Sequence, residues 1–192
     1  MGKQMFKKLF LQIFVLAGTC LLFMGMQEGA NVVAYRQMQQ GLYNQALQTY
    51  IQNGNNSGAG TVYCTLHMYN EALASFQKAK DDSGMGMAYL GKHNIEQARA
   101  SFQKVNDQNG LGMVLMAQGR YDDALKVFQS NNNYSSMGTA YLAKHEYDKA
   151  VPCFQKVNDL SGLALVYNDK RQYDRAIALA TQANDSSALA LA

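Results

Sequence analysis

The apolar and small residues of this chain recur with a fixed period of 26 residues. One position of the period is always alanine, and the residue four positions later is aromatic in five of six copies. The alanines are Ala46, Ala72, Ala98, Ala124, Ala150 and Ala176. The residues four positions later are Tyr50, Phe76, Phe102, Phe128, Phe154 and Ala180. Such self-similarity is typical of repeat architectures, in which each copy folds as one supersecondary unit.

Three further positions of the period each hold one kind of residue. Three residues before the alanine stands a tyrosine in five copies and Ile95 in the third. A position further upstream is always small: Ala34, Gly60, Gly86, Gly112, Gly138 and Ala164. Another is always asparagine or aspartate: Asn55, Asp81, Asp107, Asn133, Asp159 and Asp185.

These positions predict two helices in each copy. An Asn or Asp ahead of an apolar-periodic run accepts hydrogen bonds from the free amides of a first turn, so this position predicts the N-cap of a first helix, the A helix. The residue before it is Gly or Asn in every copy except at Lys80, and both types tolerate the left-handed conformation that ends a helix. The aromatic, alanine and aromatic residues at i, i+3 and i+7 predict one face of a second helix, the B helix. The small alanine would let the A helix approach between the two large side chains.

Each predicted helix is too short to be stable alone. A period of 26 residues holds two helices of about 11 residues, each about 16 Å long. Such a hairpin cannot bury its own apolar face, and stacking on its neighbours would complete the core. The pattern therefore predicts an all-α solenoid in which each repeat contacts mainly the next.

The repeat resembles the tetratricopeptide repeat (TPR). That family's series of small, aromatic, aromatic, alanine and aromatic residues is matched by Gly138, Tyr141, Tyr147, Ala150 and Phe154. The second copy matches as fully, and the other four miss one position each, over roughly residues 31–182. The usual TPR period is about 34 residues, so this repeat is shorter, and it lacks the family's trailing proline. The resemblance implies a right-handed α-solenoid of about six short helix-turn-helix repeats over residues 29–192, with superhelical pitch and groove width changed by the shorter period.

Residues 1–28 read as a targeting segment with an N-terminal hydrophobic helix. Lys3, Lys7 and Lys8 precede an apolar stretch over residues 9–26. This stretch favours an uncleaved signal anchor or transmembrane helix; a cleaved signal peptide and a lipid-bearing Cys20 are the alternatives. Basic residues flank it only on the N-terminal side, which predicts that the repeats lie on the extracytoplasmic side of a membrane, the periplasm in a bacterium.

Charge argues against a nucleic-acid partner. Residues 1–26 hold 3 of the 17 basic residues and none of the 14 acidic ones, so the remainder carries 14 of each. A neutral repeat domain without a basic stripe lacks the usual electrostatic footprint of nucleic-acid binding.

The residues that could carry chemistry have simpler explanations. His67, His93 and His145 share one position of the period with Gly41, Gly119 and Arg171, which predicts a turn with positive φ rather than a ladder of metal ligands. The two cysteines beyond the leader, Cys64 and Cys153, are interpreted as packing residues. Gly84, Gly86 and Gly91 lack the lysine and the strand of a phosphate loop, and close helix packing explains them better. We therefore expect a protein that is not an enzyme and that needs neither a cofactor nor a metal.

Pro152, the only proline, falls about six residues into the fifth B helix, where it removes a hydrogen bond. It predicts either a kink or a late helix start.

Function is expected from the exposed face of the A helices. In TPR proteins the A helices line the concave groove, so the resemblance implies that ligand contacts come from the residue after the small position and from the residue three further on. The first of these positions holds Tyr35, Thr61, Met87, Met113, Thr139 and Leu165. The second holds Met38, Cys64, Leu90, Met116, Leu142 and Asn168. This lining lacks the Lys, Arg and Asn that clamp a peptide carboxylate and suits an apolar segment or helix of another protein. The alternative is that the short helices draw these positions into the core between repeats.

These features together predict a membrane-tethered scaffold for protein–protein interactions, a structural subunit of a larger membrane-associated assembly. A secreted or lipid-anchored TPR module that binds peptides transiently, as adaptor or chaperone, is the alternative. Asp185 would cap a further A helix that has no B helix after it, and Leu189 and Leu191 at this end are expected to dock on a partner or a second copy.

Overall fold

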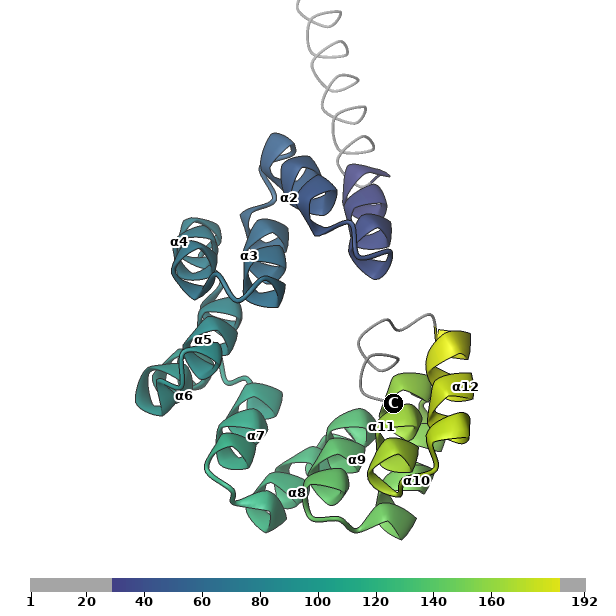
Figure 1. Ribbon diagram of the computed structural model, residues 1–192. Helices are drawn as coiled ribbons and strands as arrows, with labels where there is room; N and C mark the ends of the chain where they lie inside the picture. The colour runs from purple at the N-terminus through teal and green to yellow at the C-terminus, as the bar shows by residue number, and fades with distance from the viewer. Residues whose placement is uncertain (1–28, 184–192) are drawn as a thin grey trace, which may run out of the picture. The chain divides into compact units, whose positions relative to one another are not determined.

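The computed structural model describes residues 29–183, and all regular secondary structure in that range is α-helical. The A helices are the segment 29–39, α3 (Asn56–Thr65), α5 (Asp82–Gly91), α7 (Gln108–Ala117), α9 (Tyr134–Ala143) and α11 (Leu160–Asp169). The B helices are α2 (Tyr43–Gln52), α4 (Tyr69–Ala79), α6 (Ile95–Lys104), α8 (Tyr121–Ser130), α10 (Tyr147–Lys156) and α12 (Tyr173–Ala183). Short helices packed in neighbouring pairs form a helical repeat arrangement, as Figure 1 shows.

The predicted N-caps of the A helices are confirmed wherever the structure describes them. In α3, α5, α7, α9 and α11 the side chain of the capping residue accepts a hydrogen bond from the backbone amide three residues later. Asp107, for example, accepts from the Gly110 amide at 2.9 Å. Asp185 lies outside the described residues.

Left-handed residues end the helices at two positions of each repeat. Gly41, Gly119, the three histidines and Arg171 all have φ between 57° and 73°, so the interpretation of the histidine position as a turn is confirmed. The residue before each described N-cap also has positive φ, and this includes Lys80 at 57°. The expectation that Lys80 would be an exception was wrong. The Lys80 amide donates to the Gln77 carbonyl and the Asp81 amide to the Phe76 carbonyl, and these bonds offset the roughly 1–2 kcal/mol that a non-glycine residue loses in this conformation.

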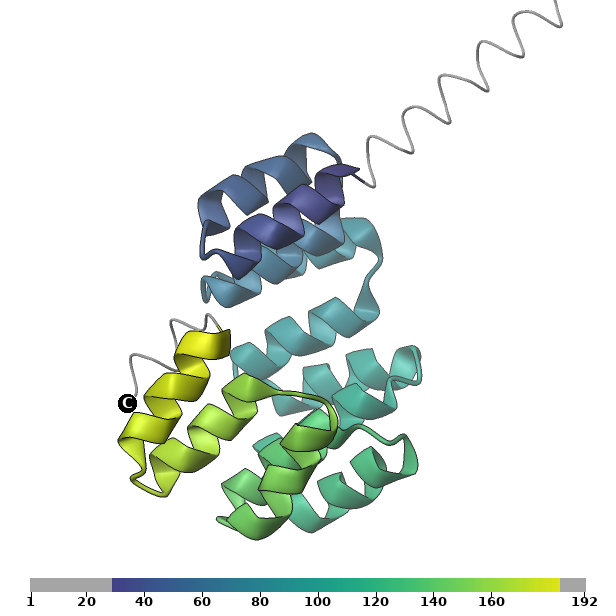
Figure 2. The same cartoon turned by 90° about the vertical axis from the view of Figure 1, so that its right-hand side faces the viewer.

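The helices form two compact units, the first ending at Lys92 and the second beginning at His93. In the first unit, α2 packs on α3, α3 on α4, and α4 on α5, and α3 also contacts α5. In the second unit each helix from α6 to α12 packs on the next, and α9 also contacts α11. Figure 2 shows the same succession of helices within each unit from the side.

Aromatic rings packed on glycines lie in the cores of the first five repeats. The ring of Phe76 lies close to both Gly60 and Gly84. A Cβ added at Gly60 would stand 2.6 Å from a ring carbon, and one added at Gly84 would stand 2.3 Å from a ring carbon. Phe154 lies in the same way between Gly138 and Gly162. These two rings therefore fill the space between their own A helix and the A helix of the next repeat. The repeated alanines, at 0–1% exposure, are buried in the same cores.

Pro152 does not delay the start of its helix. α10 begins at Tyr147 with Pro152 inside it, so the expected late start was wrong. The proline is exposed, whereas Ala150, Cys153 and Phe154 are buried. Packing of that buried face holds the helix in place despite the missing donor.

Candidate partner-binding surface

The first series of expected contact residues remains on the surface of both units. In the first unit Tyr35, Thr61 and Met87 are exposed, and Tyr35 keeps 61% of its surface. In the second unit Thr139 and Leu165 are exposed, and Met113 is half-buried. The core between repeats therefore does not absorb this series.

The two threonines in this series present little polarity. The Thr61 hydroxyl donates to the Ser57 carbonyl at 3.0 Å, and the Thr139 hydroxyl donates to the Ser135 carbonyl at 3.1 Å. Each hydroxyl is thus already bonded within its own helix, a common arrangement for Thr inside a helix. What these positions can offer a partner is mainly apolar contact.

The second series, three residues further along each A helix, is half-buried throughout. Met38, Cys64 and Leu142 pack against the buried clusters of their repeats. The one amide in the series, Asn168, has a buried Oδ1 that has no hydrogen-bond partner in the described part of the chain. This series therefore belongs partly to the packing between helices and lies on the same helices as the exposed first series.

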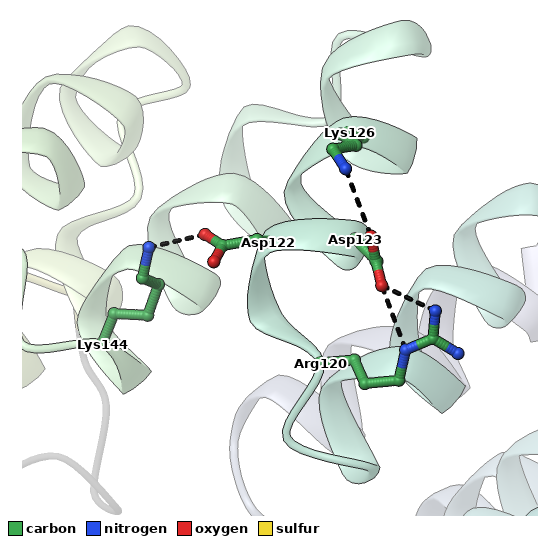
Figure 3. A network of polar contacts seen from close by, with 5 residues as sticks. All are labelled: Arg120, Asp122, Asp123, Lys126 and Lys144. Carbon is green, nitrogen blue, oxygen red and sulfur yellow. Dashed lines mark hydrogen bonds and ion pairs between the residues drawn. The ribbon is translucent and has the colours of Figure 1, made fainter.

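Charged side chains in the second unit neutralise one another. Lys144, at the end of α9, reaches Asp122 at the start of α8 at 2.6 Å, and Asp123 accepts from Arg120 at 2.6 Å and from Lys126 at 3.3 Å (Figure 3). Hydrogen bonding to Arg120 and then to Lys126 lowers the pKa of Asp123, and bonding to Asp122 and then to Glu146 raises the pKa of Lys144. Exposed pairs of this kind contribute little to stability, because water screens both charges. The Lys144–Asp122 pair joins two successive repeats, and the two pairs of Asp123 lie within α8 and its N-cap.

Histidine and cysteine side chains also serve local roles. The Nδ1 atoms of His67 and His145 lie 2.7 Å and 2.9 Å from the hydroxyls of Tyr69 and Tyr147, each at its own turn. Burial raises the pKa of the Cys64 and Cys153 thiols. Among residues 29–183, no group of three or more His, Cys, Asp or Glu side chains is placed to hold a metal ion.

A second polar feature, which the sequence interpretation missed, joins successive repeats within each unit. Asp81 accepts from the Gly84 amide at 2.8 Å with one carboxylate oxygen and from the Ser57 hydroxyl of the preceding repeat at 2.9 Å with the other. Asp159 does the same with the Gly162 amide and Ser135. We call these contacts between a capping residue and the second residue of the preceding A helix the cap ladder.

The cap ladder follows a donor and acceptor rule. Where the cap is Asn, the partner 24 residues earlier is also Asn: Asn55 donates to Asn31, and Asn133 donates to Asn109, each at 2.8 Å. Where the cap is Asp, which can only accept, the partner is Ser, which can donate. In the sequence, the partner residues are, in order, Asn31, Ser57, Ser83, Asn109, Ser135 and Ser161. The capping residues 24 positions later are Asn55, Asp81, Asp107, Asn133, Asp159 and Asp185. This matching was the sequence signal that could have revealed the ladder.

The remaining candidate residues lie outside the described range: residues 1–28 with Cys20, and Leu189 and Leu191. Within residues 29–183, no helix is long and apolar enough to cross a membrane. The chain matches no protein-family model, no curated protein and no solved structure.

Proposed function

We propose that this chain is a non-enzymatic scaffold that binds other proteins through the exposed series on its A helices. The observation that carries the proposal is one position of the repeat that is exposed in five of the six A helices, and Tyr35, Met87 and Leu165 give it apolar side chains. An apolar segment or an amphipathic helix of a partner could lay its side chains along such a series. Methionine adapts readily to partners of different shape.

The arrangement of polar groups supports a binding role over catalysis. The carboxylates with shifted pKa, Asp123 and Glu146, are bonded to neighbouring cations at the surface. Of the thiols with raised pKa, Cys153 is buried and Cys64 is half-buried against the core of its repeat. A catalytic site would instead gather perturbed groups in one pocket within reach of one another.

The finer architecture is part of the same proposal. The helix pairs, their order and the small and aromatic positions support a shortened TPR-like solenoid, for which we propose the right-handed winding of that family. The half-buried second series would then form the floor of a groove. A partner donor opposite Asn168 would satisfy its buried carbonyl oxygen.

The membrane tether rests on the sequence of residues 1–28. We propose that this segment is retained as a signal anchor and that the repeats stand on the extracytoplasmic side, within a larger assembly. The test is extraction of native membranes with a mild detergent, followed by sizing and mass spectrometry of the chain and its companions. An unprocessed chain in one large, stoichiometric complex is the expected result. A shortened or lipidated chain that elutes alone would overturn both the tether and the assembly.

The binding surface is tested in the same extraction with paired variants. Met87→Lys and Leu165→Lys place a charge in the exposed series, and Ile51→Lys places the same charge on an exposed apolar residue of α2 that is not in the series. Because burying an unpaired lysine is costly, the first two variants should lose the companion proteins and Ile51→Lys should keep them. Equal loss in all three, or in none, would contradict the proposed surface.

A further inference from the structure

The last helix of the described range leaves two apolar side chains uncovered. On α12, Tyr173 is 47% exposed and Ile177 is 41% exposed. The equivalent residues one repeat earlier, Tyr147 and Val151, are half-buried because they pack against the cluster that α10 shares with α11. On α12 these two side chains have no following A helix to pack against within the described residues.

The first described helix, an A helix, also has an uncovered apolar surface. On segment 29–39, Val32 is 57% exposed and Val33 is 47% exposed. The equivalent residues of α11 are Gly162, which is buried, and Leu163, which is 8% exposed. Those two residues face the preceding B helix, so Val32 and Val33 mark an A-helix surface that lacks such a helix within the described range.

The sizes of the side chains at the two surfaces are matched to each other. At the position of Val32, later repeats have only glycine or serine, and a Cβ added at Gly162 would stand 2.3 Å from the Phe154 ring. A valine there cannot pack against a B helix that carries the ring. α12 alone has no ring at that place, because it has Ala180 where the other five B helices have Tyr or Phe. Between most internal repeats, a large ring on the B helix packs against a glycine on the next A helix. At the two ends the sizes are reversed: the B helix has the small Ala180 and the A helix has the larger Val32.

We infer that α12 of one copy receives segment 29–39 of a second copy, so that the chains associate head to tail and continue the repeat array. The contact reuses the internal packing of α10 on α11, with Ala180 and Val32 in place of the ring and the glycine. Such an interface joins two different surfaces and does not close on itself unless the rotation between copies allows a ring. It does not use the exposed series on the A helices, so it can fail while the proposed function stands.

The first test measures the mass of the full chain in mild detergent by sedimentation across a range of concentrations. The mass should rise with concentration. Val33→Asp should block one surface and Ile177→Asp the other, each weakening association at least about tenfold because the contact would bury an unpaired carboxylate. An equal mixture of the two variants should form dimers and nothing larger, since each retains one intact surface. Ile51→Asp, an exposed apolar residue on α2, is the matched control and should associate like the unchanged chain.

The second test restores the internal pattern of sizes. Ala180→Phe alone should weaken association, because the added ring meets Val32. Adding Val32→Gly in the same chain should recover it. Circular dichroism checks that the variants stay folded, and failure of the double variant to recover association would overturn the size match.

Two other results would overturn the inference. If association persists unchanged in Ile177→Asp, it arises elsewhere, for example between the N-terminal segments. If the chain stays monomeric at every concentration and Ile177→Asp instead lowers its melting temperature, residues 184–192 of the same chain cover α12.

Discussion

Replacing Asp159 by alanine should destabilise the second unit by about 2 kcal/mol. The change removes the acceptor for the Gly162 amide, at 2.8 Å, and the acceptor for the Ser135 hydroxyl, at 2.9 Å. Loss of an N-cap costs about 1 kcal/mol. A hydrogen bond to a charged group contributes somewhat more than the usual 1 kcal/mol, but Ser135 is exposed and can bond to water instead, so we take about 1 kcal/mol for the ladder bond.

The measurement is urea unfolding followed by far-ultraviolet circular dichroism, with an unchanged slope as the check on comparability. Ser135→Ala removes the ladder bond alone and should cost about 0.5–1 kcal/mol. Asp159→Asn keeps a capping oxygen and should cost little, as the asparagine cap at Asn133 indicates. Gln155→Ala, on an exposed residue of α10, is the surface control.

The double variant with both Asp159→Ala and Ser135→Ala separates the two bonds. Because the ladder bond is already absent after the first change, the second should add almost nothing. Fully additive effects would show that Asp159 and Ser135 do not interact. An Asp159→Ala variant as stable as the Gln155→Ala control would refute the capping argument as well.

Four further changes have defined outcomes. Gly84→Ala should destabilise the first unit by about 1–2 kcal/mol, measured by urea unfolding, because the clash of a Cβ only 2.3 Å from the Phe76 ring outweighs a gain of about 1 kcal/mol in helix propensity. Adding Phe76→Leu should recover part of the lost stability, and a single variant that is more stable than the unchanged chain would contradict the close packing. His93→Gly should raise stability by up to about 1 kcal/mol, because His93 has φ of 58° and glycine adopts this conformation without strain; a lower urea midpoint would refute this. Hydrogen bonding to Lys144 and then to Lys149 lowers the pKa of Glu146. The contribution of Glu146 to stability should therefore be present above the ordinary carboxyl pKa of about 4 and be lost as pH falls through the lowered pKa. An NMR titration of Glu146 with a midpoint at or above the ordinary pKa would contradict this. Burial raises the pKa of Cys153, so iodoacetamide at about pH 8.5 should modify it more slowly in the folded chain than in urea, and equal rates would count against its burial.

Local features of the chain were readable from residue types. The capping residues at Asn55, Asp81, Asp107, Asn133 and Asp159 lie where the Asn and Asp positions predicted them. Caps and glycine-rich turns depend on groups within a few residues of one another, so the period alone was enough to locate them. Lys80 and the helix start near Pro152 were misjudged because neighbouring residues override the local preferences: backbone bonds close the end of α4 around Lys80, and α10 begins at Tyr147 because its buried face packs on the core.

By itself, the sequence determined the period, the helix pairs and the alternation of A and B helices, because these follow from hydrogen bonds and apolar spacing within one repeat. The tertiary structure alone decided which small residues touch the rings, and that the first series on the A helices is mostly exposed while the second is half-buried. Those outcomes depend on how closely one helix approaches the next. That distance is set jointly by a ring such as Phe154 and by the glycines on both sides of it, and no single position in the sequence specifies it.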